Sequence, residues 1–283
     1  MILLTGANGQ LGREFQKLFK RKGVRYIGLG REELDITDMD AVKNFLKEKN
    51  IDYIINCAAY NDVDKAEGEQ KKCFALNCYA PENMALESKK IGTVFVTYST
   101  DFVFDGLKNE PYTESDLPNP LNAYACSKSE GESRVLAAYD RSFVIRTSWV
   151  FGMGNDNFVK RVIKWSKNSE KLNIVDDQVS APTYSKDLAE YSWKLINTER
   201  FGLYHLSNSG AASKYDVAKY VLEKIEWKGR LVRAKTAEFG LPAKRSPYSK
   251  LSSEKAEKVI GEKMPHWKNG IDRFFEEMEE GNF

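Results

Sequence analysis

The sequence of 283 residues predicts an α/β protein, with a doubly wound parallel sheet and a smaller mixed α/β lobe. Three observations lead to this prediction. Short apolar runs alternate with helical patterns through the first half of the chain, a glycine-rich turn follows the first apolar run, and the alternation loosens after about residue 150.

The first half contains five expected strands and four expected helices. The strands are short apolar runs, which is typical of strands buried on both faces of a parallel sheet. We place strands at 2–4, 24–29, 53–57, 94–98 and 143–145, and helices at 11–22, 39–49, 69–90 and 123–139. Right-handed crossovers would join such strands, so a ligand is expected beyond their carboxyl ends.

The second half is expected to form the smaller lobe. Helices are predicted at 156–167, 186–197, 213–226, 253–259 and 267–279, with a short strand at 172–175 and loops that contain Pro182, Pro242 and Pro247. We therefore assign residues 1–150 to a nucleotide-binding domain and residues 151–283 mainly to substrate binding. Some later segments are expected to return to the first domain, and a cleft is expected between the two.

Composition narrows the class of protein. The 43 basic and 41 acidic residues nearly balance, which argues against a nucleic-acid partner or an anionic membrane surface. The chain has no basic leader with a cleavage site and no apolar stretch near the roughly 20 residues of a membrane span, so we expect a cytoplasmic protein. The four cysteines lack a CxxC pair and the two histidines lie far apart, which predicts reduced thiols and no zinc site.

The segment TGANGQLG at residues 5–12 indicates a phosphate-binding turn. It lies between the first apolar run and a helical pattern, and it spaces three glycines three residues apart. Backbone amides at the start of a helix can bind a pyrophosphate, and the missing side chains let it approach closely.

A tyrosine and a lysine at helical spacing point to acid catalysis. Tyr124 and Lys128 stand four residues apart on the expected helix 123–139, so they share one face. A phenol is a weak acid near neutral pH unless a cation stabilises its phenolate, and we expect Lys128 to lower the pKa of Tyr124 in this way. Thr100, at the end of the fourth strand, can form a hydrogen bond to a substrate oxygen.

The glycine turn, the Ser-Thr pair at 99–100 and the YxxxK motif resemble the extended short-chain dehydrogenase/reductase superfamily, whose sheet is of the Rossmann type. Further segments narrow the resemblance to the dTDP-4-dehydrorhamnose reductase family over nearly the whole chain. They are AAY at 58–60, VDKAE at 63–67, STD at 99–101, RTSWV at 146–150, NFV at 157–159, DQ at 177–178, APT at 181–183 and GLYHLS at 202–207.

The resemblance implies reduction of the C4 ketone of dTDP-4-dehydro-β-L-rhamnose to dTDP-β-L-rhamnose with a nicotinamide cofactor. It implies catalytic roles for Tyr124, Lys128 and Thr100. The expected cofactor-binding residues are Gly6, Gly9, Gln10, Leu11, Gly12, Arg31, Asp35, Ile36, Ala58, Ala59, Tyr60, Tyr98, Tyr124 and Lys128. The expected substrate-binding residues are Thr100, Asp101, Trp149, Asn157 and Arg245.

Several positions depart from common patterns. The region where NAD-preferring folds usually carry an acidic residue has Gly30 and Arg31, which predicts NADPH as the preferred cofactor, with NADH possible. Phe102 stands where many family members have tyrosine. Some members form dimers through a metal held by glutamates; Glu14 is present here, but Lys186 occupies another of the expected acidic positions, so we predict no bound metal.

Other functions stay open from the sequence. A sugar-nucleotide epimerase or dehydratase uses a similar tyrosine, although dehydratases typically carry a glutamate where this chain has Phe102. Another NDP-4-keto-sugar reductase is a further alternative. A regulatory subunit without catalysis is possible as well, because the regulatory subunit of methionine adenosyltransferase is similar to this family. We expect a nucleotide-sugar substrate, no nucleic-acid or membrane partner, and a monomer or weak homodimer.

Overall fold

The computed structural model describes residues 1–280 and is built around a parallel sheet of six strands. The strands are β1 (Ile2–Thr5), β2 (Tyr26–Leu29), β3 (Tyr53–Asn56), β4 (Val94–Thr100), β5 (Ser142–Thr147) and β10 (Gly202–His205). Their order across the sheet is β10-β5-β4-β3-β1-β2, and every neighbouring pair is parallel. The order reverses between β1 and β3, where ligands of doubly wound sheets bind. The predicted fold class is confirmed.

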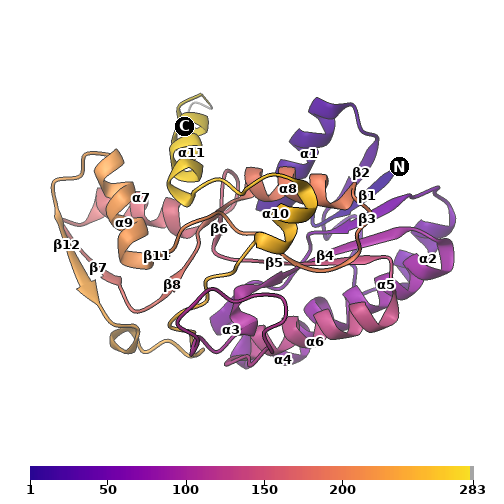
Figure 1. Cartoon of the computed structure of the whole chain (residues 1–283), viewed down its shortest axis with the longest axis horizontal. Coiled ribbons are helices and arrows are strands. Elements are labelled where there is room, and N and C mark those ends of the chain that lie inside the picture. Colours follow the sequence, from indigo (N-terminus) through magenta and orange to yellow (C-terminus); the bar gives the residue numbers. More distant parts are fainter. Residues whose placement is uncertain (281–283) are drawn as a thin grey trace.

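Helices cover both faces of this sheet (Figure 1). One face packs against α1 (Gln10–Lys22), α8 (Ser185–Ile196) and α10 (Glu254–Ile260), and the other against α2 (Met39–Lys47), α5 (Ala80–Ile91) and α6 (Ala123–Ala138). Side chains alternate along each strand, so Ile2 and Leu4 enter the first layer while Leu3 enters the second. The apolar runs of the strands are therefore buried on both faces.

Part of the second half of the chain belongs to this sheet. Strand β10 pairs with β5 in the register Gly202↔Phe143, and α8 shares its apolar core with α1. The segment 202–207 is among those that resemble the family, but its four-residue strand is too short to be recognised from its apolar pattern.

The expected helix 69–90 is confirmed as one continuous helical run, made of α4 (Gln70–Phe74), the π-helical turn η1 (Ala75–Tyr79) and α5. A separate short helix that was not expected, α3 (Val63–Gly68), precedes it. Asp62 begins α3 by accepting a hydrogen bond from the Lys65 amide at 3.1 Å, and Glu69, with φ −116° and ψ 37°, separates α3 from α4.

The second lobe has its own apolar core on the left of Figure 1. Strand β7 (Lys171–Val175) pairs in parallel with β12 (Arg230–Ala234), beside α7 (Phe158–Asn168), α9 (Lys214–Lys224) and α11 (Trp267–Glu280). Short pairs connect the lobe to the sheet: β6 (Val150–Phe151) with β9 (Thr183–Tyr184), and β8 (Val179–Ser180) with β11 (Ala212–Ser213). The 3-10 turns η2 (Asp101–Val103) and η3 (Thr236–Phe239) complete the described elements.

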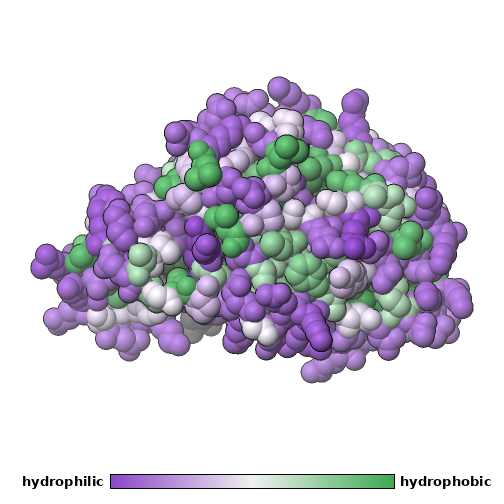
Figure 2. Space-filling model, turned by 90° about the horizontal axis from the view of Figure 1, so that it is seen from below, coloured by the Kyte–Doolittle hydropathy of each residue, from purple (hydrophilic) through white to green (hydrophobic). Residues whose placement is uncertain are grey.

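The face of the molecule that is seen from below is predominantly hydrophilic. Figure 2 shows hydrophobic areas of limited size among hydrophilic residues on this face. Tyr79, Leu86 and Ile91 are exposed along η1 and α5. Among residues 1–280, no helix has the length and apolar character needed to cross a bilayer.

Candidate active site

A groove of about 740 Å³ lies at the carboxyl ends of β1, β2 and β3, where the glycine motif forms its floor. Gly6 has φ +65°, and a Cβ there would stand 2.4 Å from the Ala58 nitrogen. A Cβ on Gly12 would stand 2.4 Å from the Gly6 carbonyl oxygen, so this glycine lets α1 pack closely on the turn. These two glycines shape the turn, while Gly9 faces the groove.

Most of the expected cofactor residues line this groove. They are Gly6, Gly9, Arg31, Asp35, Ile36, Ala58, Ala59 and Tyr60. Gln10 lines a second cavity instead, Leu11 packs on the core and Gly12 lies inside the turn. The groove also contains Arg13 and Asn155, which sequence reasoning missed.

Arg31 stands at the β2 end of the groove with most of its side chain exposed. Its Nε donates to Asp35 at 3.3 Å, and Asp35 also accepts hydrogen bonds from the amide and hydroxyl of Thr37. The Thr37 hydrogen bonds hold the pKa of Asp35 below its ordinary value. Arg31 is therefore a largely exposed cation beside the groove. Position 30, next to it, is a glycine and so carries no carboxylate.

Tyr124 and Thr100 meet where β4 ends and α6 begins. The Asn122 side chain begins α6 by accepting from the Ala125 amide at 2.8 Å, and Tyr124 follows in the first turn. Burial raises the pKa of Tyr124, and a hydrogen bond with Thr100 acts in the opposite direction. Thr100 also accepts from the Phe102 amide at 3.1 Å, which fixes the position of its hydroxyl. The pair is thus a buried phenol beside an oriented hydroxyl.

The Lys128 ammonium forms a hydrogen bond with β4, and its expected effect on the pKa of Tyr124 stays a prediction. Its Nζ donates to the Tyr98 carbonyl oxygen at 3.1 Å, and Thr100 is the group that lowers the pKa of Tyr124. Burial lowers the pKa of Lys128 itself to about 8. The four-residue spacing places Tyr124 and Lys128 on one face of α6. The direction of the Lys128 side chain, however, depends on its hydrogen bond to strand β4.

Asp101 is a buried carboxylate next to this pair. It accepts hydrogen bonds from the hydroxyls of Thr100 at 3.1 Å, Ser180 at 2.9 Å and Ser249 at 2.5 Å. Burial raises the pKa of Asp101 to about 6, against the effect of these hydroxyls. The two serines come from β8 and from the loop before α10, so the second lobe completes the surroundings of a residue on η2.

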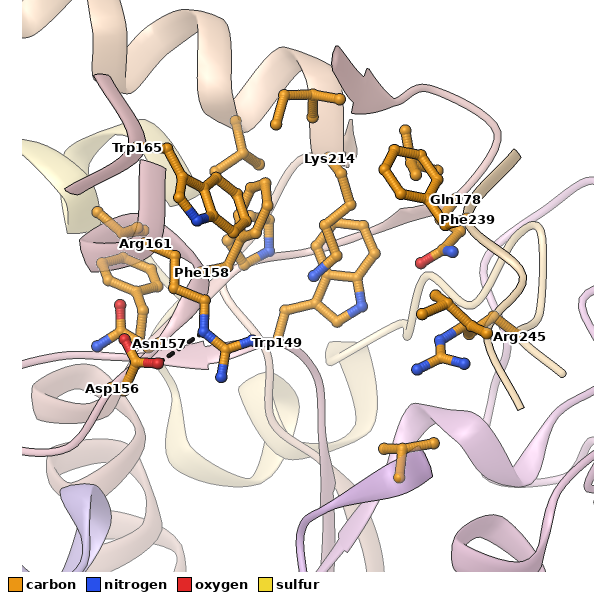
Figure 3. A pocket seen from close by; sticks show the side chains of 18 of the residues that line it. Trp149, Asp156, Asn157, Phe158, Arg161, Trp165, Gln178, Lys214, Phe239 and Arg245 are labelled. Carbon is orange, nitrogen blue, oxygen red and sulfur yellow. Dashed lines mark hydrogen bonds and ion pairs between the residues drawn. The ribbon is translucent and has the colours of Figure 1, made fainter. Parts of the chain in front are cut away.

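A cavity of about 660 Å³ extends from Phe102 into the second lobe. Figure 3 shows its aromatic walls, Trp149, Phe158, Trp165 and Phe239, and three cations from different elements. Trp149 has φ 41°, a left-handed backbone conformation that is strained for an aromatic residue. The cavity is apolar with a few charged groups, as small-molecule sites usually are.

The expected substrate residues occupy different parts of this cavity. Trp149, Asn157 and Arg245 line it, whereas Thr100 and Asp101 are buried behind Phe102. The Asn157 amide donates to Gln10 at 3.0 Å and so joins the second lobe to the glycine turn.

Arg245 is held by a carboxylate of the first lobe. Its guanidinium donates twice to Asp64, at 2.9 and 2.6 Å. Sequence reasoning identified the cation but not this partner, which lies in the VDKAE segment.

Asn77, in the π-helical turn η1, is a polar residue that sequence reasoning missed. Its side chain accepts from the Tyr60 amide at 2.9 Å and donates to the Tyr60 carbonyl at 3.0 Å and to Ser127 at 3.1 Å. A Cβ on Gly131 would stand 2.2 Å from the Asn77 carbonyl oxygen, so this glycine lets α6 lie against η1. Asn77 thereby ties the cofactor groove to the helix that carries Tyr124.

Glu14 is buried, and Lys17 bridges it to Glu277 with Nζ at 3.0 and 2.6 Å from the two carboxylates. Burial raises the pKa of Glu14. Lys186 acts on both carboxylates through its charge. Within residues 1–280, no group of three or more histidine, cysteine or acidic residues is placed to hold a metal ion.

Comparison with known proteins identifies the family. The model of the RmlD substrate binding domain matches residues 1–280. The chain is 36% identical over 276 residues to the spore coat polysaccharide biosynthesis protein SpsK of Bacillus subtilis, covering 98% of this chain and 97% of the relative.

Two solved structures agree closely with this fold. A dTDP-4-dehydrorhamnose reductase from Clostridium acetobutylicum has a TM-score of 0.95 at 38% identity, with 98% of this chain and 99% of that one covered. The enzyme from Bacillus anthracis, in complex with NADP, has a TM-score of 0.94 at 37% identity, with 98% of both chains covered. The protein therefore belongs to the dTDP-4-dehydrorhamnose reductase family, that of the RmlD substrate binding domain.

Proposed function

We propose that this protein reduces the C4 ketone of dTDP-4-dehydro-β-L-rhamnose to give dTDP-β-L-rhamnose, with NADPH as the preferred cofactor and NADH possible. The observation that carries the proposal is the Tyr124–Thr100 pair, because Tyr124 packs with Tyr60 of the glycine-floored groove and with Phe102 of the aromatic cavity. Relatives named as dTDP-4-dehydrorhamnose reductases, one of them solved with NADP, support it.

The groove fits a dinucleotide. A Cβ on Gly6 or Gly12 would collide with backbone, and Gly9 leaves the groove open beside the start of α1, where a pyrophosphate is stabilised. When bound, the nicotinamide supplies a hydride to the substrate carbon. Gly9, Arg13 and Ala58 would hold the dinucleotide, and Lys128 would reach its nicotinamide ribose.

Tyr124 donates a proton to the oxygen of the reduced carbonyl. Its ground state is the neutral phenol, because burial raises the pKa, so the proton is present when the substrate arrives. When the phenolate forms, the Thr100 hydroxyl would turn its single hydrogen from Asp101 toward Tyr124, and this hydrogen bond favours the charged form. The wall formed by Trp149 orients the sugar beside this pair, and Asp101 holds the Thr100 hydroxyl in place.

Arg31 is the proposed determinant of cofactor choice. It is exposed beside the groove and can bind the 2′-phosphate of NADPH through two N–H donors. Arg31→Ala should raise KM for NADPH by about tenfold or more, in line with the loss of one charge-assisted contact, and leave KM for NADH nearly unchanged. Equal effects on the two cofactors, measured in steady-state assays, would refute this role.

The reaction itself is tested by the absorbance of reduced nicotinamide. Purified protein, NADPH and dTDP-4-dehydro-6-deoxy-L-mannose, generated in situ by the upstream enzymes, should oxidise the cofactor and yield dTDP-L-rhamnose. Tyr124→Phe should bind NADPH as the parent protein does and lose at least about a hundredfold in kcat. Tyr191→Phe, whose hydroxyl only donates to the Lys263 carbonyl on the surface, is the matched control.

Two alternatives predict different results. A different NDP-keto-sugar reductase or epimerase would leave this substrate untouched but act on another sugar nucleotide with the same dependence on Tyr124. A regulatory subunit would bind cofactor and keep its biological effect in Tyr124→Phe. The paired Tyr124 and Thr100 hydroxyls favour catalysis over this second role.

The remaining parts of the proposal concern the setting of the enzyme. We place the cofactor mainly in the first lobe and the sugar nucleotide mainly in the second, in a cytoplasmic protein that is a monomer or weak homodimer. The four cysteines are free thiols, which is usual for reducing compartments. Sedimentation with and without a metal chelator tests the oligomeric state and the predicted lack of a bound metal together.

A further inference from the structure

Lys214 points into the substrate cavity from an unusual place. It is the first residue of α9, and Figure 3 shows its side chain directed toward the ring of Trp149. The Nζ atom lies 3.7 Å from the centroid of Trp149 and 4.6 Å from that of Phe158. The ammonium thus rests on two aromatic faces inside the cavity.

Lys214 has no acidic partner at ion-pair distance among residues 1–280, whereas both arginines of the cavity are paired. Arg161 is paired with Asp156 at 2.7 Å, and Arg245 with Asp64 at 2.6 Å. An anionic ligand can therefore bind Lys214 without displacing a carboxylate. Arg161 and Arg245 can bind one only by sharing or breaking an ion pair.

The position of Lys214 is unfavourable for the helix itself. A cation in the first turn opposes the helix dipole, and a carboxylate or neutral residue is preferred there. The Ser213–Asp216 capping box supports this helix end instead. A charge that costs stability, in a cavity wall beside a strained tryptophan, is typical of a residue retained for ligand binding.

We propose that Lys214 binds the diphosphate of the nucleotide sugar. The inference rests on the proposed function, which makes the substrate a sugar nucleotide with its charge on the diphosphate alone. The reacting C4 and the diphosphate-bearing C1 lie at opposite ends of a pyranose ring, so the anion-binding cation must stand one ring away from Tyr124. The Phe102 ring packs edge-on against Tyr124 and lines the same cavity as Lys214, which places this cation on that side of the site.

The charges around Lys214 make the proposal testable by pH. Burial lowers the pKa of Lys214 to about 7; Asp101 on η2 acts to raise it, while Arg245 and Arg161 lower it further. A bound diphosphate favours the ammonium, so binding above pH 7 requires uptake of a proton. From pH 7 upward the Asp101 carboxyl, whose pKa is about 6, is already ionised, so the change of charge falls on Lys214.

The experiment is calorimetric titration with dTDP-glucose and UDP-glucose in the presence of NADPH, from pH 7 upward. These probes carry diphosphates without a titrating oxygen in this range. For the parent protein, affinity should fall by up to about tenfold per pH unit. Lys214→Met, which keeps the apolar stem, should bind about tenfold to a hundredfold more weakly at pH 7 and show a flat profile.

Lys214→Arg is the decisive control, because it restores binding with a charge that does not titrate. Its affinity should stay nearly constant with pH and exceed that of Lys214→Met throughout. Equal affinity of Lys214→Met and the parent protein would overturn the inference and leave the reductase proposal intact. If neither probe binds the parent protein while NADPH does, both proposals fail. Lys214→Met should bind NADPH as the parent protein does. Loss of NADPH binding would indicate that Lys214 supports the fold rather than a ligand, and would likewise overturn the inference.

Discussion

The buried ion pair between Arg146 and Glu132 gives the sharpest prediction about stability. Arg146 lies on β5 and Glu132 on α6, one turn after Lys128, so the pair fixes the catalytic helix to the sheet. The side chains are only 3% and 4% exposed, and three N–H···O hydrogen bonds of 2.7 to 3.1 Å join them. Arg146→Met keeps much of the side-chain volume but leaves a carboxylate buried with its main donors gone.

The cost of this change should be about 3–5 kcal/mol, the range for breaking one partner of a buried pair. The double variant Arg146→Met/Glu132→Leu removes the uncompensated charge and should therefore recover most of that loss. The matched control is Lys258→Met, whose partner Glu254 and own side chain are 75% and 79% exposed, and whose cost should stay within about 1 kcal/mol.

Urea denaturation, followed by tryptophan fluorescence, measures all four proteins. The reasoning requires a large loss for Arg146→Met and a smaller one for the double variant. It is refuted if Arg146→Met loses less than about 1 kcal/mol, or if the double variant is no more stable than the single one.

Three further predictions follow from buried polar groups and close contacts. Burial lowers the pKa of His205 to about 3, below the unfolded value of about 6.5, so unfolding takes up a proton. The free energy of unfolding should therefore fall by up to about 1.4 kcal/mol per pH unit below about pH 6.5, and acid denaturation of His205→Gln should show a shallower fall. Gly131→Ala should destabilise the fold because its Cβ would meet backbone of η1 at 2.2 Å, while Gly68→Ala, with open space around it, should not; thermal melting compares the two. Ser249→Ala removes a donor that lowers the pKa of Asp101, so the acidic limb of the kcat profile should move to higher pH, and an unmoved limb would exclude Asp101 as its source.

Local patterns in the sequence predict most of the sheet but not its edge. Strands β1, β3, β4 and β5 are apolar runs because both of their faces are buried. Strand β10 has only four residues and includes a glycine, so its pairing with β5 depends on tertiary contact rather than on pattern. The break between α3 and α4 depends on the backbone conformation of Glu69 alone, to which apolar spacing is insensitive.

In the candidate site, too, some residues could be predicted from local sequence and others could not. The glycine turn and the Tyr124 motif are local in sequence, and their glycines, phenol and lysine could be named from spacing alone. The roles of Lys214 and Asn77 depend on neighbours from other elements: Trp149 for the first, and Tyr60 and Ser127 for the second. Such contacts leave no periodic signal, and so these residues emerge only from the assembled fold.

The return of β10 to the sheet has a consequence for synthesis of the chain. When the ribosome has produced residue 150, β5 still presents an unpaired edge, because its outer partner is encoded some fifty residues later. An exposed edge of this kind readily pairs with other chains. We therefore expect that a fragment ending near residue 150 aggregates, and that the nascent first lobe completes its sheet only after residue 205 has left the exit tunnel. The two halves of the sequence are consequently not exchangeable modules.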